Sequence, residues 1–436
     1  MSYSSLLNAL ATAFLADDSA VESIVERCTL TLGKPWPWLI PLARRYASTF
    51  AAGARPRHRD VVVFLHNDEN FRTALAQHRS QIAVAKRLLI SQRMQPVAAA
   101  AHWKLPLIET VGALADWLAL TPTELEWFAD LKALDYKKPN PRLRHYRYCV
   151  LAKAYGNLRL IEAPKPRLKY LQQRILAGIL DRVPPHPAAH GFVPSRSIKS
   201  YAAPHTGQRV ILRIDLQDFF PSLAGARIQT VFRTLGYPES VADLLGGICT
   251  NAAPRDVWTA PLPPHQTRLM YARPHLPQGA PTSPALANIC LYRADCRLTG
   301  LAEAAGAEYT RYADDLAFSE GEDFDRRVER FAAHVAAILH EEGFAVHHRK
   351  TRIMRQSVRQ HLAGIVANHH PNVRRRDFDA LKATLTNCVR LGPATQNRDS
   401  HPDYRAYLEG RIAFVEMVNP SKGTRLRELF RKIVWT

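Results

Sequence analysis

The chain has 436 residues, 47% of them hydrophobic and 22% charged, so a largely disordered protein is excluded. Lysine and arginine number 59 against 39 acids, and the formal net charge of +20 favours a polyanionic partner, nucleic acid ahead of a membrane surface. No apolar run reaches the roughly 18 residues of a membrane span, and the N-terminus lacks the basic segment of a signal peptide. The six cysteines form no C-x-x-C pair, which favours a protein of the reducing cytoplasm.

Residues 1–135 are predicted to be mostly helical, because apolar side chains recur there at helical spacing. A Pro-, Arg- and Gly-rich stretch at 52–59 indicates a linker within this region. Thr121, Pro122 and Glu124 form the pattern of a helix start, with proline in the first turn and an acid after it. No catalytic pattern occurs here, so the sequence leaves the role of this extension open.

From residue 137 to residue 182 the composition becomes strongly basic, with twelve lysines and arginines against two acids, and with four interleaved tyrosines. Basic residues mixed with aromatic ones suit a groove that neutralises phosphates and stacks bases. A solvated charged face is the alternative interpretation.

Two later segments each combine apolar strands with aspartates. Residues 210–216 form an apolar run with one arginine, which predicts a buried strand that ends at Asp215. Residues 309–319 predict two short strands around a tight turn at 313–315.

The segments around these strands are also informative. A rigid Pro-rich loop at 276–284 leads into a helix, for which Ser283 is the predicted cap and Pro284 lies in the first turn. A second basic stretch runs from 344 to 382, and apolar spacing predicts a helix around 381–389.

The most informative feature is the set of three acids Asp215, Asp314 and Asp315. Carboxylates crowded together repel one another unless a cation neutralises them, and carboxylate ligands suit Mg²⁺ or Mn²⁺ better than zinc. Two such ions roughly 3.5–4 Å apart can clamp the attacking and leaving oxygens of a phosphoryl transfer. The adjacent pair alone is a weak signal, because Ala16-Asp17-Asp18 repeats it where a helix cap or solvated turn is expected.

Four sequence blocks occur in the order found in bacterial reverse transcriptases and resemble the retron-type group most closely. They are RIDLQDFFPS at 213–222, LPQGAPTSP at 276–284, YADD at 312–315, and Gly343-Phe344 leading to Lys350-Thr351. Segments that resemble the family's fingers and its primer-grip approach are KAYGNLR at 153–159, HGFVPSRS at 190–197 and RQHLAG at 359–364. The resemblance extends over about residues 140 to 430.

This resemblance implies an α+β fold of the right-hand polymerase type. Its expected parts are fingers, a palm built on an antiparallel sheet with packed helices, and a helical thumb, preceded by a mostly helical N-terminal extension. The implied domain limits are 1–135 for the extension, 136–365 for fingers and palm, and 366–436 for the thumb.

The resemblance also implies roles for single residues. Asp215, Asp314 and Asp315 resemble the catalytic, metal-binding triad, with two Mg²⁺ ions as cofactor and Mn²⁺ as a substitute. Phe220 resembles the bulky residue that clashes with a ribose 2′-hydroxyl and so favours deoxynucleotides, whereas Phe219 is expected in the core. The other residues implied to bind the nucleotide are Lys153, Arg159, Gln278, Gly279 and Lys350. Those implied to bind nucleic acid are Arg196, Arg374, Arg375 and Arg376, for which ordinary surface charge is the alternative.

The implied function is RNA-directed addition of deoxynucleotides to a primer 3′ end, or to a 2′-hydroxyl of the RNA itself, as in retrons. The expected partners are a structured RNA that serves as template and primer, the DNA product, dNTPs, and a toxin or effector protein of an anti-phage system; no membrane is expected. The alternatives are a template-independent or DNA-templated polymerase of a defence locus, and a non-catalytic RNA-binding scaffold.

Two family signatures are altered in this sequence. Residues 201–205 read YAAPH where retron enzymes carry Asn-Ala-x-x-His, and residues 362–364 read LAG where they carry Val-Thr-Gly. Both signatures are associated with recognition of the partner RNA, so the departures weaken the prediction of a standard retron RNA and leave catalysis untouched. No maturase or H-N-H-like extension follows the thumb, which argues against a mobile group II intron protein.

Overall fold

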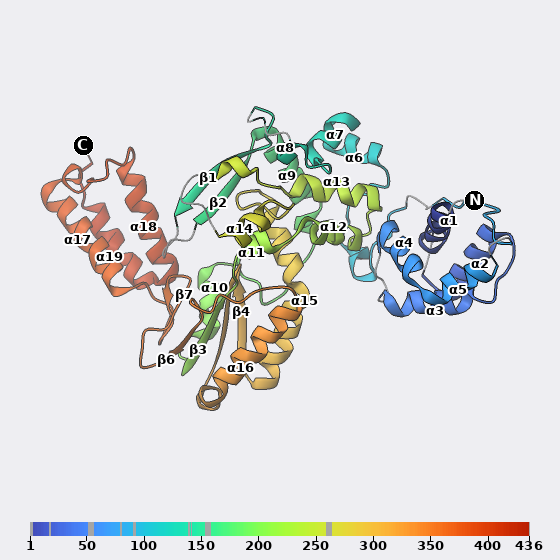
Figure 1. The fold of residues 1–436 in the computed structure, drawn as a ribbon. Helices are drawn as coiled ribbons and strands as arrows, with labels where there is room; N and C mark the ends of the chain where they lie inside the picture. The colour runs from blue at the N-terminus through green and yellow to red at the C-terminus, as the bar shows by residue number, and fades with distance from the viewer. Residues whose placement is uncertain are drawn as a thin grey trace. The chain divides into compact units, whose positions relative to one another are not determined.

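The computed structural model describes residues 3–16, 19–50, 56–78, 81–89, 93–137, 140, 142–152, 158–258 and 264–435. Lys153, the Asp17-Asp18 pair and residues 52–55 of the predicted linker lie outside the described residues. Figure 1 shows the helices and strands of the chain, coloured from blue at the N-terminus to red at the C-terminus. The chain divides into two compact units, of which one comprises Met1–Arg182 and Ala224–Pro274 and the other Val183–Leu223 and His275–Thr436. The three-part domain division stays a prediction.

Five helices at the start of the first unit form a bundle around one apolar core. They are α1 (Tyr3–Leu15), α2 (Val21–Leu32), α3 (Leu39–Thr49), α4 (His58–Asn67) and α5 (Glu69–Gln77). Apolar side chains from all five are buried against one another, as amphipathic helices require. The helical prediction is therefore confirmed for this bundle. The predicted linker is wrong at its end, because α4 already begins at His58.

The rest of the first unit combines helices with one two-stranded antiparallel sheet, β1 with β2. Its elements are η1 (Ala98–His102), α6 (Val111–Leu118), α7 (Pro122–Ala129), α8 (Leu134–Lys137), β1 (Tyr146–Ala152), β2 (Leu158–Pro164), α9 (Pro166–Gly178), η3 (Leu180–Arg182), α12 (Gly225–Thr234), α13 (Glu239–Cys249), η5 (Arg255–Val257) and α14 (His265–Tyr271). The predicted start of α7 is confirmed: Glu124 N donates to Thr121 Oγ1 at 3.2 Å, and Thr121 N donates to Glu124 Oε2 at 2.8 Å. α6 and α7 pack against α13.

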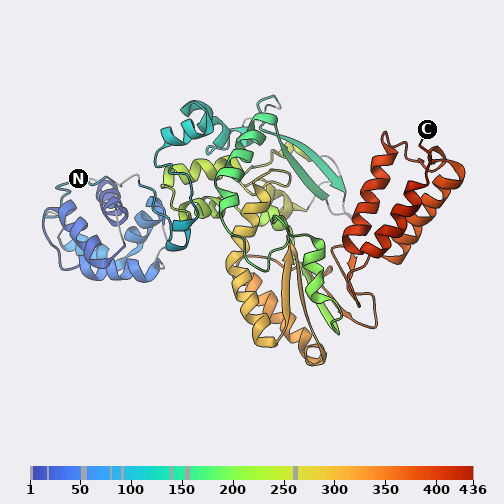
Figure 2. The same ribbon diagram turned by 180° about the vertical axis from the view of Figure 1, so that it is seen from behind.

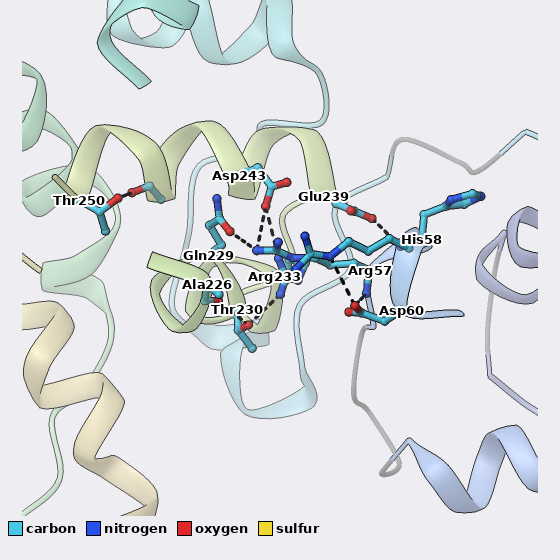
Figure 3. A network of polar contacts seen from close by, with 12 residues as sticks. Arg57, His58, Asp60, Ala226, Gln229, Thr230, Arg233, Glu239, Asp243 and Thr250 are labelled. Atoms are coloured by element: carbon cyan, nitrogen blue, oxygen red, sulfur yellow. Dashed lines mark hydrogen bonds and ion pairs between the residues drawn. The ribbon is translucent and has the colours of Figure 1, made fainter. Parts of the chain in front are cut away.

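A polar network ties the start of α4 to α12 and α13 (Figure 3). Arg57, only 9% exposed, donates to Gln229 Oε1 of α12, and its Nη2 lies 3.6 Å from Asp243 Oδ1 of α13. The backbone N–H of His58 donates to Glu239 Oε2 at 3.0 Å. The helical bundle is thus attached through a charged side chain that is largely withdrawn from water.

Replacement of Arg57 by methionine is expected to weaken this attachment by about 1.5–3 kcal/mol, because Gln229 and Asp243 lose a charged donor. Urea unfolding followed by tryptophan fluorescence measures the change. The matched control is Arg59→Met, since the Arg59 side chain is 71% exposed and its pairing with Asp60 lies at the surface. The control should change stability by less than about 0.5 kcal/mol. Equal losses in the two variants would contradict an anchoring role for Arg57.

The second unit is built on a four-stranded antiparallel sheet in the order β4-β5-β3-β6. The strands are β3 (Val210–Asp215), β4 (Glu308–Tyr312), β5 (Asp315–Glu320) and β6 (Arg352–Arg355). As predicted, β3 is buried along most of its length and ends at Asp215. The long helices α15 (Ser283–Ala305) and α16 (Glu322–Glu341) pack against this sheet, as Figure 2 shows from behind. The prediction of an α+β fold with an antiparallel palm-type sheet is confirmed.

The loop at 276–284 departs from the prediction in one detail. α15 begins at Ser283, with Thr282 as its N-cap and a proline in its first turn. Ser283 is therefore not the cap. Its hydroxyl donates instead to the carbonyl oxygen of Pro277 at 2.6 Å. This hydrogen bond connects the two ends of the loop, so the hydroxyl does not cap the N–H groups of the helix.

The last part of the second unit is a bundle of α17 (Arg375–Leu391), α18 (Tyr404–Val418) and α19 (Pro420–Arg431). Apolar side chains of all three helices share a core with the hairpin of β7 (His361–Leu362) and β8 (Ile365–Val366). The helix predicted around 381–389 is confirmed as part of α17. The remaining short elements are α10 (Ile198–Ala202), η4 (Ala203–His205), α11 (Phe219–Ser222) and η6 (Pro393–Thr395). Among the helices of the described residues, none combines the length and apolar character that a bilayer crossing needs.

Candidate active site

The end of β3 and the turn between β4 and β5 carry the three predicted acids. In the antiparallel register of β3 and β5, Asp215 lies directly opposite Asp315. Asp314 is in the turn, where its carbonyl oxygen accepts a hydrogen bond from Leu216 N at 2.9 Å. The acids that are remote in the chain therefore lie at the same end of the sheet.

The turn itself is tight and unusual. Tyr312 pairs with Asp315, so only two residues connect β4 to β5. Ala313 has a φ of +55°, in the left-handed region that residues other than glycine seldom adopt. A Cβ atom on Gly191 would lie 2.5 Å from Ala313 N, so the backbone at Gly191 packs directly on the turn and leaves no room for a larger residue.

Each of the two facing carboxylates is paired with a cation. Asp215 is 6% exposed and accepts a hydrogen bond from Lys350 Nζ at 2.7 Å. Asp315 is 7% exposed and accepts from Arg213 Nε at 2.8 Å. Lys350 and Arg213 thus balance negative charge that would otherwise be costly in this buried setting.

At Asp315 the positive charge of Arg213 does not fully offset the effect of burial on the carboxylate. Burial raises the pKa of Asp315 to about 6, Arg213 opposes the increase, and the nearby charges of Asp314 and Asp215 add to it. The three carboxylates therefore influence one another electrostatically, which is the behaviour expected where a cation is needed.

The donor chemistry of this site fits a hard divalent cation, since carboxylate oxygens are the ligands that Mg²⁺ and Mn²⁺ prefer. Within the described residues, however, no three His, Cys, Asp or Glu side chains are already arranged to hold a metal ion. The oxygens of Asp215 and Asp315 are directed to Lys350 and Arg213 instead. A divalent ion would therefore compete with these two cations for the same oxygens.

The raised pKa of Asp315 predicts a pH-dependent ion affinity. Below about pH 6 a bound proton must leave before an ion binds, so the apparent affinity for Mn²⁺ should rise about tenfold per pH unit and then level off. Electron paramagnetic resonance titrations between about pH 5 and 7 measure this. In the Asp315→Asn control, the affinity should be weaker and nearly independent of pH. A pH-independent affinity in the wild-type protein would contradict the assignment.

The raised pKa of Asp315 also makes folding stability depend on pH. The pKa of Asp315 is about 6 in the folded protein and 3.8 in its reference state, so the folded state binds this proton more tightly. Its contribution to stability is therefore present below about pH 4 and is lost as the pH rises through about 6.

The two phenylalanines of the first sequence block occupy different surroundings. Phe219 is 3% exposed and its ring centroid lies 6.0 Å from that of Phe344, so it has the predicted place in the core. Phe220 is half-buried, with ring centroids 5.3 Å from Phe219 and 6.5 Å from Phe192. Its predicted contact with the nucleotide sugar stays a prediction.

The other residues predicted to bind the nucleotide are spread over both units. Gln278 is half-buried and Gly279 is exposed with a φ of +132°, which favours glycine. Lys350 lies at the acids, paired with Asp215. Arg159 is an exposed residue of β2 in the first unit, and Lys153 lies outside the described residues. Their contacts with a triphosphate stay predictions.

The residues predicted to bind nucleic acid differ in their surroundings. Arg196 donates from Nη1 to the carbonyl oxygens of Pro187 and Ala189, so its guanidinium supports its own loop. Arg374, Arg375 and Arg376 lie at the start of α17 and line a groove of about 880 Å³, together with Arg359 and Lys422.

Two features escaped the sequence analysis. Arg213 pairs with Asp315, and its position two residues before Asp215 in a strand could have indicated that both side chains share a face. His401, Tyr404 and Tyr407 form a stack with interplanar angles of 15–19°, and their spacing of three residues was the available signal.

The comparisons with known proteins agree with these motifs. The sequence pattern of the family described as "Reverse transcriptase (RNA-dependent DNA polymerase)" matches residues 138–370. The chain is 41% identical over 300 residues to the retron Mx65 reverse transcriptase of Myxococcus xanthus, which covers 68% of this chain and 66% of that protein. It is 35% identical over 329 residues to the retron Mx162 reverse transcriptase of the same organism, and this match covers 72% of this chain and 65% of that protein. The chain thus spans about two thirds of the length of these relatives.

One solved structure is a more remote match to this chain than the retron enzymes are. A foamy viral protease-reverse transcriptase in complex with double-stranded DNA is 15% identical to this chain, with a TM-score of 0.32, and the match covers 66% of this chain and 43% of that one.

Proposed function

Because the chain belongs to the reverse transcriptase family and is similar to its retron-type members, we propose that it is an RNA-directed DNA polymerase. The observation that carries this proposal is the pairing of Asp215 with Asp315 across β3 and β5, with Asp314 in the adjoining turn. A non-catalytic scaffold would have no need to keep three mutually repelling carboxylates at one end of a sheet.

In the proposed reaction, Asp215, Asp314 and Asp315 would hold the divalent ions, which would supply activation of the attacking hydroxyl and charge neutralisation at the triphosphate. The chain's own cations then serve a second purpose. The side chain of Lys350 is 49% exposed, so its ammonium group would also be available to the phosphates of an incoming nucleotide. Phe220 would limit the space at the sugar 2′ position and so select deoxynucleotides.

Two surfaces of the second unit support nucleic acid as the partner. The groove at the start of α17 presents several cations to a phosphate backbone. The stack of His401, Tyr404 and Tyr407 has Arg411 5.7 Å above the ring of Tyr407, a combination that suits stacking with unpaired bases. We propose a structured RNA as template and primer, with retron-like DNA as product. An effector protein, an anti-phage role and a cytoplasmic location stay predictions.

Primer extension tests this function. Purified protein is supplied with the four dNTPs and Mg²⁺, with and without an RNA template, and nucleic acid that co-purifies with it is sequenced. Template-dependent DNA synthesis, or a co-purified branched DNA–RNA molecule, would support the proposal. Synthesis without a template, or on DNA only, would favour the other polymerase activities. RNA binding without any synthesis would favour a scaffold.

Salt is expected to weaken RNA binding strongly. If 6–10 phosphates are neutralised, as in duplex complexes, the affinity should fall about 10³–10⁵-fold between 50 and 200 mM salt. Fluorescence anisotropy with a labelled RNA hairpin measures the slope. A nearly flat response would contradict the assignment of basic surfaces to phosphate binding.

A further inference from the structure

A fully buried arginine lies next to the turn that carries Asp314 and Asp315. Arg311 on β4 and Asp295 on α15 are both 0% exposed. Arg311 Nε donates to Asp295 Oδ1 at 2.8 Å, and its Nη2 donates to Asp295 Oδ2 at 2.7 Å. A buried ion pair adds little stability compared with apolar residues of the same size, so its other contacts are the informative ones.

The third nitrogen of the Arg311 guanidinium reaches the turn. Nη1 donates to the carbonyl oxygen of Ala313 at 3.1 Å and to Asn288 Oδ1 at 3.0 Å. Asn288 in turn donates from Nδ2 to the carbonyl oxygen of Gly191 at 2.9 Å. The guanidinium of Arg311 therefore links α15 to the turn between β4 and β5, and Asn288 extends this link to the loop at Gly191.

The backbone of Arg311 strengthens the same link. Its N–H donates to the carbonyl oxygen of Ala188 at 2.7 Å, and its own carbonyl oxygen accepts from His190 N at 2.7 Å. The loop at 188–191 is thereby held along β4, next to the turn. The backbone at Gly191 packs against the nitrogen of Ala313, and the Arg311 guanidinium donates a hydrogen bond to the carbonyl oxygen of Ala313.

These two contacts matter because Ala313 has a backbone conformation that alanine seldom adopts without support from its surroundings. Its φ of +55° is uncommon for a residue with a side chain, and such conformations persist only where the surroundings impose them. The next two residues along the chain are the acids, so any relaxation of Ala313 would displace them relative to Asp215.

We propose that Arg311, fixed by Asp295, is a positioning residue that holds the Ala313 carbonyl and so keeps Asp314 and Asp315 in place for divalent-ion binding. Its consequence for catalysis rests on the proposed polymerase function, whereas its effect on ion affinity does not. Arginine is suited to this task because its rigid fork reaches several acceptors at once, which the single ammonium group of lysine does not reproduce.

Two variants of the full-length chain test the proposal. Arg311→Lys keeps the buried positive charge, and Arg311→Met combined with Asp295→Leu removes both charges while filling the same space. The matched control is Arg297→Met, which breaks the ion pair between Arg297 of α15 and Glu342 away from the turn. The measurements are melting temperature, Mn²⁺ affinity by calorimetry without nucleic acid, and kcat and KM for dNTP.

Both Arg311 variants should bind Mn²⁺ about 10–100-fold more weakly, as expected when a group that orients metal ligands is lost. Their kcat should fall by a similar factor while the KM for dNTP changes little. The Arg297→Met control should bind Mn²⁺ with wild-type affinity and retain its kcat.

Variants that melt earlier yet bind Mn²⁺ as tightly as the wild type would overturn the proposal, because the ion pair would then be a core contact only. If the wild type binds Mn²⁺ but extends no primer, the polymerase function fails, and the ion affinities of the variants still decide the role of Arg311. A wild-type protein that binds no Mn²⁺ would overturn both.

Discussion

Asp315→Asn and Asp314→Asn are each expected to slow primer extension on RNA by at least about 10³-fold, equivalent to about 4 kcal/mol of transition-state stabilisation. The amide keeps the size of the carboxylate and removes the charge that holds a divalent ion, which is the type of change that costs most in an enclosed polar site. Single-turnover nucleotide incorporation measures the chemical step directly.

The matched control is Glu341→Gln, because Glu341 is an exposed acid at the end of α16 that pairs with Arg297. It should extend primers at the wild-type rate and melt at the wild-type temperature. If either aspartate variant incorporated nucleotides as fast as the wild type, the metal-binding assignment would be wrong.

Phe220→Ala is expected to raise the use of ribonucleotides relative to deoxynucleotides by about 10–100-fold, the range that a few missing carbon atoms in a substrate pocket produce. The ring of Phe220 is half-buried and supported by Phe219 and Phe192, so it is held in place and does not simply move aside. The measurement is the ratio of kcat/KM for an rNTP and the matching dNTP.

Phe219→Leu is the control for this prediction. Phe219 is buried against Phe344, so the smaller side chain should lower stability. Because Phe192 still contacts the Phe220 ring, the nucleotide preference should change much less than in Phe220→Ala. Unchanged selectivity in Phe220→Ala would remove Phe220 from the nucleotide site.

The sequence predicted β3, β4 and β5 of the palm-type sheet because their signals are local, whereas β6 was not predicted. The apolar run at 210–216 marks a buried strand, and the tight turn at 313–315 between two short strand-like stretches marks a hairpin. That Asp215 lies opposite Asp315 depends on pairing between distant strands, which followed from the resemblance to a family and from no local pattern.

Two further features, at Arg311 and Arg57, were missed because they depend on long-range packing. Arg311 is one charged residue in a short strand, and only the position of α15 provides Asp295 as its partner. Arg57 falls in a stretch whose composition indicates a linker, yet contacts with α12 and α13 make it part of a buried network. Side-chain chemistry alone identifies neither partner.

The N-terminal region shows the same division between local and distant information. Helical periodicity correctly predicted the helices of its bundle, and the pattern of Thr121, Pro122 and Glu124 correctly predicted the start of α7. The packing of α6 and α7 against α13 was not foreseen, because amphipathic helices do not specify their partners. The predicted extension therefore belongs to the same compact unit as β1 and β2.

Crystals of the protein grown with Mn²⁺ and analysed by anomalous diffraction test the central claim most directly. We expect an anomalous peak within bonding distance of carboxylate oxygens of both Asp215 and Asp315, with Lys350 and Arg213 turned away from them. A saturating concentration of Mn²⁺ that left both ion pairs intact, with no peak at these acids, would contradict the account.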